Sequence, residues 1–160
     1  MTIFTFLRSI YACLAKLSGK AGPTQQETPK NAIPSMLSRP WTLHFKTGSV
    51  IPPPPGLEDG DQLSIISQVA NLYTDAISGV VTNKAGKQYP LNGQIDEKFD
   101  VTFFVTSGID VYLFKGTAYF AAGAISMEGR FQQVSFTDID EGNWSAQAQG
   151  GGEEDTGRSY

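Results

Sequence analysis

Short alternations of apolar and polar residues, each ended by turn residues, fill the chain from Trp41 to Gln147. In Trp41–Lys46 the alternation has a period of two, which is the pattern of a strand with one buried face. Asn83–Lys87 and Ser107–Asp110 are typical hairpin turns between such segments. We expect strands at 41–46, 63–67, 76–82, 88–96, 101–106, 111–120, 124–133 and 142–147.

Four of these segments carry an internal glycine: Gly79, Gly93, Gly116 and Gly129. Glycine weakens a strand unless the sheet bends sharply or another group approaches closely. Eight consecutive strands with short connections favour antiparallel pairing, and closure removes the exposed edges of such a sheet. We therefore predict an all-β domain over 41–147, an eight-stranded antiparallel up-and-down barrel. A barrel of this size is either filled by side chains or holds one small ligand.

The remaining segments differ in composition from the barrel. Residues 1–20 combine an apolar stripe at three- and four-residue spacing with three cations, which predicts a cationic amphipathic helix. Three roles stay open for it: a secretory signal, a targeting or membrane-surface helix, or a helix packed on the barrel. The compartment is therefore open too. Residues 21–40 contain four prolines and are predicted as a linker, 52–55 as a polyproline loop, and 148–160 as a flexible acidic tail.

Charge is unevenly divided along the chain. The first 49 residues hold six basic residues and one acid, and the rest hold six basic residues and fifteen acids. The acidic body argues against nucleic-acid binding, and the basic leader favours peripheral membrane contact through residues 1–20. Cys13 is the single cysteine and His44 the single histidine. The sequence therefore predicts no internal disulfide, no metal site and no cofactor.

Short motifs follow one another through the body at Trp41-Thr42, Lys87–Asp96, Phe103–Thr106, Phe114–Tyr119 and Gly142–Ala146. In this order they resemble strands of the avidins and streptavidins, and they extend over most of 41–147. The resemblance implies an eight-stranded barrel that binds biotin at one open end, between aromatic walls and hydroxyl and amide groups. It also implies a homo-oligomer.

The resemblance assigns roles to individual positions. Phe114 matches an aromatic of the pocket, Trp144 a tryptophan that reaches a neighbouring subunit's ligand, and Ser49 a serine of the first strand. With two further polar groups, the expected ligand-binding residues are Phe114, Ser107, Asn83, Ser49 and Trp144.

Three aromatic positions of the family's pattern are changed, and Gly152 stands where the family has an aspartate after the last tryptophan. Val81, Ser107 and Glu128 stand where the family has a tyrosine and two tryptophans. Each missing aromatic wall removes roughly 1.5–3 kcal/mol of apolar burial. Since about 1.4 kcal/mol is a tenfold change in affinity, tight biotin binding is not expected.

Two ionisable groups of the body, His44 and Glu128, are candidate functional groups. His44 alternates with Leu43 and Phe45, which predicts that it faces outward without a catalytic partner. Glu128 is predicted to face outward if Met127 points inward, and is otherwise a buried carboxylate and a functional candidate. We therefore predict no catalytic residues.

The prediction for function is a noncatalytic barrel that binds a small organic ligand. Two alternatives stay open: a ligand-free interaction or assembly module tethered by its leader, and a barrel-type isomerase or cyclase. A polar-lined cavity at one barrel end would favour ligand binding, and a filled interior would argue against it.

Overall fold

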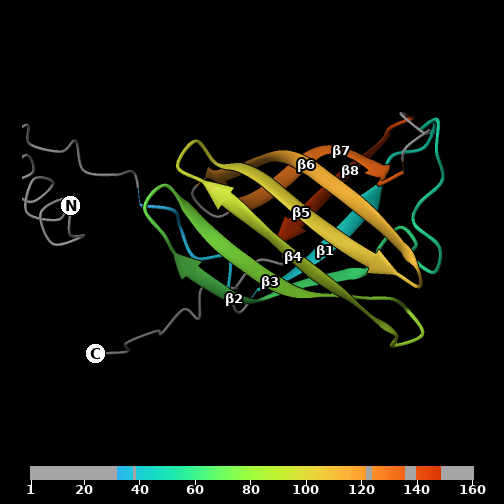
Figure 1. Ribbon diagram of the computed structural model, residues 1–160, viewed down its shortest axis with the longest axis horizontal. Coiled ribbons are helices and arrows are strands. Elements are labelled where there is room, and N and C mark those ends of the chain that lie inside the picture. The colour runs from blue at the N-terminus through green and yellow to red at the C-terminus, as the bar shows by residue number, and fades with distance from the viewer. Residues whose placement is uncertain (1–31, 38, 122–123, 136–139, 149–160) are drawn as a thin grey trace, which may run out of the picture. The chain divides into compact units, whose positions relative to one another are not determined.

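The computed structural model describes residues 32–37, 39–121, 124–135 and 140–148. Eight β-strands make up the fold (Figure 1): β1 Pro40–Phe45, β2 Gln62–Ala70, β3 Thr74–Thr82, β4 Gln88–Asp96, β5 Asp100–Ser107, β6 Asp110–Ala121, β7 Ala124–Gln133 and β8 Gly142–Ala148. The helix predicted for residues 1–20 lies outside the described residues. None of the described segments is a helix of the length and hydropathy needed to cross a membrane.

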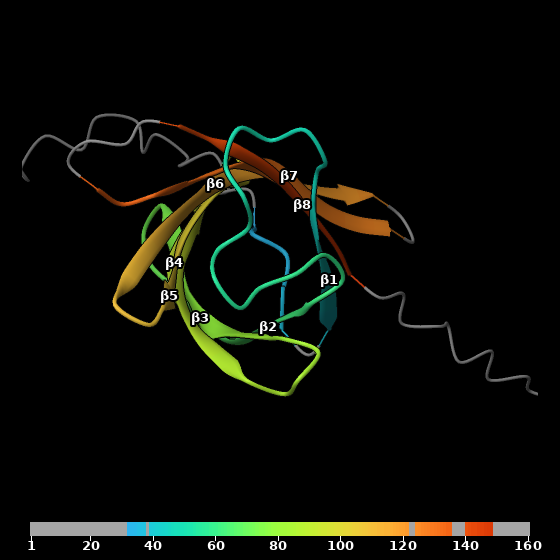
Figure 2. The same ribbon diagram turned by 90° about the vertical axis from the view of Figure 1, so that its right-hand side faces the viewer.

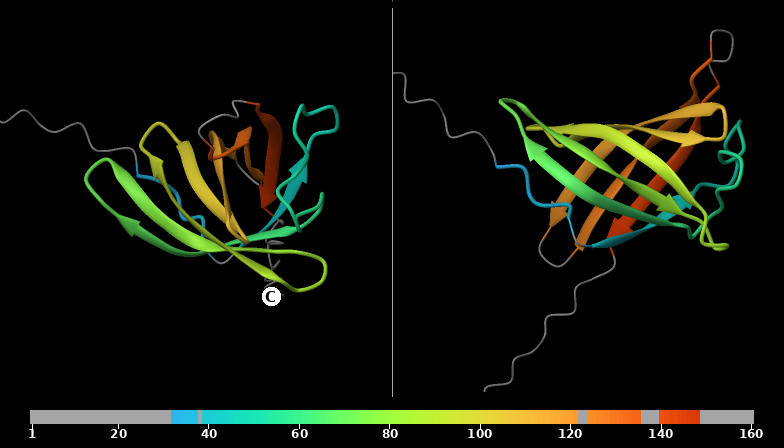
Figure 3. Two further views of the ribbon diagram at one scale, coloured as in Figure 1. Left: turned by 45° about the vertical axis from the view of Figure 1, so that its right-hand side comes forward. Right: turned by 60° about the horizontal axis from the view of Figure 1, so that its bottom comes forward.

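The strands form one closed barrel in which each strand pairs antiparallel with its neighbours in sequence. The first and last strands close it, with Trp41 opposite Ala148 and Phe45 opposite Trp144. Figure 3 shows the strands inclined to the barrel axis, as closure of a twisted sheet requires. The predicted all-β, eight-stranded antiparallel up-and-down barrel is confirmed.

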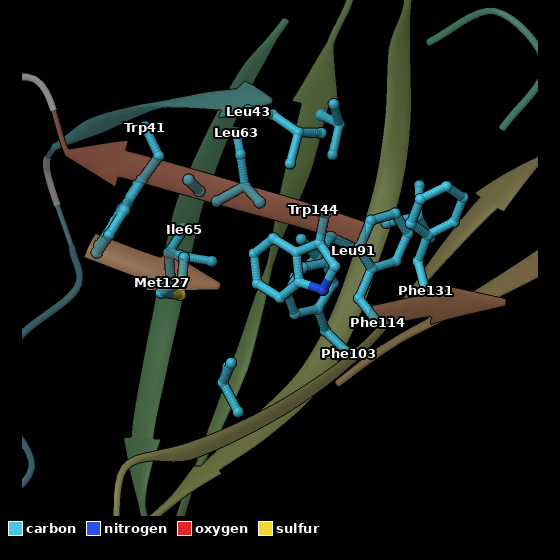
Figure 4. Close-up of a cluster of buried hydrophobic side chains, with 14 of the residues drawn as sticks. Trp41, Leu43, Leu63, Ile65, Leu91, Phe103, Phe114, Met127, Phe131 and Trp144 are labelled. Carbon is cyan, nitrogen blue, oxygen red and sulfur yellow. The ribbon is translucent and has the colours of Figure 1, made fainter. Parts of the chain in front are cut away.

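Aromatic side chains fill the middle of the barrel (Figure 4). Phe114 lies between two stacked rings, with centroid distances of 4.9 Å to Phe103 and 5.4 Å to Phe131. Trp144 meets Phe103 and Phe114 edge-on at 5.3 and 5.6 Å. These four side chains are almost completely buried. The inward half of the period-two pattern therefore builds a packed core.

Two strand glycines allow close approach beside Trp144, and one of them, Gly116, leaves room for its ring. Gly116 and Gly129 face each other across β6 and β7, and Gly129 also pairs with Trp144 on β8. A Cβ at Gly116 would collide with the Glu128 carbonyl and lie 3.0 Å from the Trp144 ring. The indole Nε1 donates to the carbonyls of Arg130 (3.1 Å) and Lys115 (3.3 Å). The close approach expected of the strand glycines is thus found here.

Different segments cover the two ends of the barrel (Figure 3). At one end lie residues 32–37, where Met36 is completely buried. Gln68 of β2 holds this segment, because its Oε1 accepts from Met36 N (2.8 Å) and its Nε2 donates to Pro34 O (3.2 Å). At the other end, which we call the mouth, lies the long connection between β1 and β2. We call this connection, residues 46–61, the strap.

Candidate functional site

The strap crosses the mouth instead of projecting into solvent (Figure 2). Its tip is a turn in which Leu57 N donates to Pro54 O (2.9 Å) and Gly56 has φ +86°. These features are typical of a type II turn with proline first and glycine second among its central residues. Both Pro54 and Leu57 are buried. The predicted polyproline loop is therefore an ordered part of the mouth.

Side chains from the β3–β4 turn, β4 and β5 fasten the strap tip. Ser107 Oγ donates to the Pro55 carbonyl at 2.6 Å, and Asn83 Nδ2 donates to the Gly56 carbonyl at 3.0 Å. Asn83 is oriented in turn because its Oδ1 accepts from Lys87 N at 2.9 Å. The buried Tyr89 side chain lies against Gly56, where an added Cβ would strike the tyrosine hydroxyl. Two of the predicted site residues thus contact the chain's own strap.

A buried carboxylate lies where the strap rejoins the barrel. Asp61 is 1% exposed, and its Oδ2 accepts from Glu58 N at 2.7 Å. Within the described part of the chain its Oδ1 is buried without a hydrogen-bond partner. An unsatisfied buried acceptor costs about 1–3 kcal/mol.

Beside the strap the mouth is hollow. A cavity of about 230 Å³ lies between the strap, the end of β1 and β7. Its wall combines aromatic, aliphatic, proline and polar side chains: Phe45, Lys46, Thr47, Gly48, Ser49, Ile51, Pro52, Pro53, Asp59 and Phe131. Phe45 and Phe131 meet edge-on at 5.3 Å and connect this cavity wall to the aromatic core. An apolar wall with a few polar groups is the usual composition of a small-molecule site.

Ser49 joins the cavity wall to the barrel. Its Oγ donates to Lys46 O (2.9 Å) and accepts from Asn143 N (3.0 Å) of β8. A second cavity, of about 120 Å³, lies against Tyr112 and the strap residues Ile51 and Pro52. Burial raises the pKa of the Tyr112 phenol above its ordinary value, and the negative charge of Asp110 raises it further.

The structure therefore separates the five predicted site residues into two groups. Ser49, Asn83 and Ser107 lie at the mouth, each bonded to the strap or within it. Phe114 and Trp144 lie in the aromatic core and are completely enclosed by their own chain.

His44 and Glu128 lie on the outer face of the barrel. His44 Nδ1 is 3.3 Å from Asp59 Oδ1, and both side chains are partly exposed. Glu128 is also outward and its carboxylate is 3.8 Å from Lys46 Nζ. Met127 is buried, so the outward prediction for Glu128 is confirmed. Among the described residues, no three His, Cys, Asp or Glu side chains gather as metal ligands.

No protein-family model matches this chain, and no curated protein matches it significantly. The site is consequently defined by its geometry. Phe45, Phe131 and Asp59 line the cavity although sequence reasoning did not select them. Asp61 and Tyr89, which hold the strap and are not part of that wall, were also missed. The signal for Asp61 was weak, because an acid in a Gly-Asp turn is ordinarily solvated. Tyr89 was visible only as one apolar position of an alternating strand.

Proposed function

We propose that this protein is a noncatalytic binding protein that takes a small organic ligand in the cavity at the barrel mouth. The single observation that carries the proposal is the cavity of about 230 Å³ with Phe45 and Phe131 in its wall and Ser49 and Asp59 beside them. Ring faces and edges supply apolar contact, and the hydroxyl and carboxylate supply orientation.

The geometry limits the ligand's size and position. Drug-sized ligands occupy pockets of about 300–1,000 Å³, so this cavity fits a smaller molecule. Phe103, Phe114 and Trp144 fill the middle of the barrel, which argues against a ligand in the interior. The proposal is therefore restricted to the cavity at the mouth. The proposal keeps an avidin-like architecture without tight biotin binding. At two of the changed positions, Val81 is buried in the core and Glu128 faces outward. The aromatic side chains that the family has at these positions are therefore not replaced by another pocket wall.

Native mass spectrometry of the full chain purified from its own source tests the proposal. We expect the protein to retain a small molecule that is released on denaturation. Thr47→Trp places an indole at the cavity rim and should abolish retention. Thr106→Trp, on the outer face of β5, is the matched control and should retain the ligand. Equal occupancy in both variants, or a ligand-free wild-type protein that takes up nothing from a small-molecule library, would contradict the proposal.

A second candidate function is self-assembly, which the resemblance also implies. Phe104 is 44% exposed and Val134 is 51% exposed. Both adjoin the outer face of β6, since Phe104 pairs with Leu113 and Val134 N donates to Val111 O (2.8 Å). Analytical ultracentrifugation of the wild type and of Phe104→Lys tests a homo-oligomer through this face. A dimer lost in the variant would support it, and an unchanged mass would not.

A further inference from the structure

We propose that the ligand of the mouth cavity is a small organic ammonium, whose charge pairs with the Asp59 carboxylate while its apolar part packs on Phe45. The proposal rests on the function proposed above, because it names the class of ligand for the same cavity. A carboxylate, aromatic rings and proline carbonyls lie together in the wall of this cavity. Together they suit a positively charged donor better than a neutral or a negatively charged ligand.

The main chain of β1 orients the Asp59 carboxylate. Its Oδ1 accepts from Phe45 N at 2.9 Å, which ties the carboxylate to the residue whose ring forms part of the same wall. His44 Nδ1 is 3.3 Å from Oδ1 and 3.4 Å from Oδ2, but His44 does not line the cavity. A carboxylate offers about four acceptor sites. Asp59 therefore keeps acceptor capacity for an ammonium bound beside the ring.

The opposite charge in the wall is directed away from Asp59. Among the described residues that line the cavity, Lys46 is the single cation, and its Nζ lies 3.8 Å from Glu128 Oε2. Glu128 is on the outer face of β7 and does not line the cavity. An anionic ligand would compete with Glu128 for Lys46 and would be repelled by Asp59. The charges around the cavity therefore favour a cation.

Other polar groups of the wall favour a ligand that donates hydrogen bonds. Pro52 and Pro53 have no N–H, so their main chain presents only carbonyl acceptors. The Ser49 hydroxyl already donates its hydrogen to Lys46 O. The neighbouring cavity, which shares Pro52, has the Asp140 carboxylate in its wall and no Lys or Arg among its described lining residues. The excess of acceptors thus extends along the strap.

The apolar part of the wall sets the form of the ligand. Phe45 and Phe131 meet edge-on with their centroids 5.3 Å apart, and Ile51 lines the same cavity. Ring faces attract ammonium groups as well as apolar surface. A cavity of about 230 Å³ leaves room for one ring and a short amine arm. An arylalkylamine such as benzylamine therefore fits the wall.

Three probes that share one ring and differ in charge test the proposal: benzylamine, benzyl alcohol and benzoate. Each is titrated into the full chain, and the methyl shift of Ile51 reports binding at the cavity wall. We expect benzylamine, a cation at neutral pH, to bind about fivefold more tightly than benzyl alcohol, with benzoate weakest. The factor is modest because the Asp59 side chain is 62% exposed, and exposed ion pairs are weak.

Two charge variants assign the preference to a residue. Asp59→Asn keeps an oxygen for Phe45 N but loses the charge, so it should bind benzylamine and benzyl alcohol equally. Lys46→Gln removes the repelling cation and should strengthen benzylamine binding. Glu97→Gln is the matched control, since it makes the same change of net charge in the β4–β5 turn at the opposite barrel end. It should keep the wild-type preference.

The outcomes separate this proposal from the function on which it rests. Tightest binding of benzoate, or a benzylamine preference that survives Asp59→Asn, would overturn the ammonium ligand and leave a small-ligand site at the mouth. Loss of benzylamine binding in Lys46→Gln would do the same. No shift of Ile51 with any of the three probes would contradict the binding function itself, and the ammonium ligand with it.

Discussion

Trp144 connects the sequence motif to the stability of the barrel. Its ring packs on Phe103 and Phe114, and its Nε1 donates to one carbonyl of β6 and one of β7. Trp144→Ala should lower the free energy of unfolding by about 3–5 kcal/mol, because it opens a cavity in a tight core. Trp144→Phe keeps a ring and should cost less. Urea denaturation of both variants measures the difference, and a loss below about 1 kcal/mol for Trp144→Ala would contradict this packing.

Tyr112 gives a prediction for alkaline pH. Burial and the charge of Asp110 raise its pKa in the folded state. The folded protein therefore holds the phenol proton more tightly than the unfolded chain, whose tyrosines titrate near pH 10. This contribution to stability is complete below about pH 10 and is lost as pH rises through the folded pKa. The phenolate absorbance of wild type minus Tyr112→Phe should appear above pH 10, and a midpoint at or below about 10 would contradict it.

The strap covers the mouth, and a hydrogen bond from Ser107 helps to hold its tip in place. Ser107→Ala removes the 2.6 Å hydrogen bond to Pro55 O and should loosen the strap tip. We expect the Leu57 amide, which donates to Pro54 O, to exchange its hydrogen several-fold faster. Thr106→Ala, at an exposed neighbouring position, is the control and should leave that exchange unchanged. Equal exchange rates in the two variants would show that Ser107 does not fasten the strap.

The segment 32–37 plays the corresponding part at the opposite end. Gln68 bonds to Met36 N, Pro34 O and Asp75 Oδ2, and Trp41 Nε1 is 3.5 Å from Met36 O. Met36→Ala should lower the free energy of unfolding by about 2–5 kcal/mol, as for other buried methionines. Met36→Leu conserves volume and should cost less than about 1.5 kcal/mol. Thermal denaturation of both variants checks this, and equal, small losses would place Met36 outside the core.

The strands were predictable because apolar and polar residues alternate along each one, and this alternation indicates which face is buried. Leu91 and Ile95 on β4, for example, share one parity and are both buried. The close approach at the strand glycines was also predictable. Gly93, for example, can approach Thr102 and Phe103 only because it has no Cβ. The ends of the barrel were not predictable in this way. Their contacts join distant residues, such as Ser107 with Pro55, and have no periodicity along the chain.

The positions of the site residues along the barrel axis were also not predictable from the sequence, because they depend on the whole molecule. A position in a strand pattern indicates which side chains point inward, but not whether the interior at that depth is open. Phe114 and Ser107 both point inward, yet one lies in the packed core and the other fastens the strap at the mouth. The difference between an inward residue in the packed middle and one at the mouth becomes visible only in the closed barrel, where aromatic rings stack across the interior.

The central claim is that the middle of the barrel is packed and that binding takes place at the mouth. Methyl-resolved NMR of the full chain, titrated with a set of small organic fragments, tests it most directly. We predict shifts at Ile51, which lies in the walls of both mouth cavities, and none at the core residues Leu91 and Ile95. Shifts at Leu91 and Ile95 with Ile51 unmoved, or no shift at any of the three, would contradict the claim.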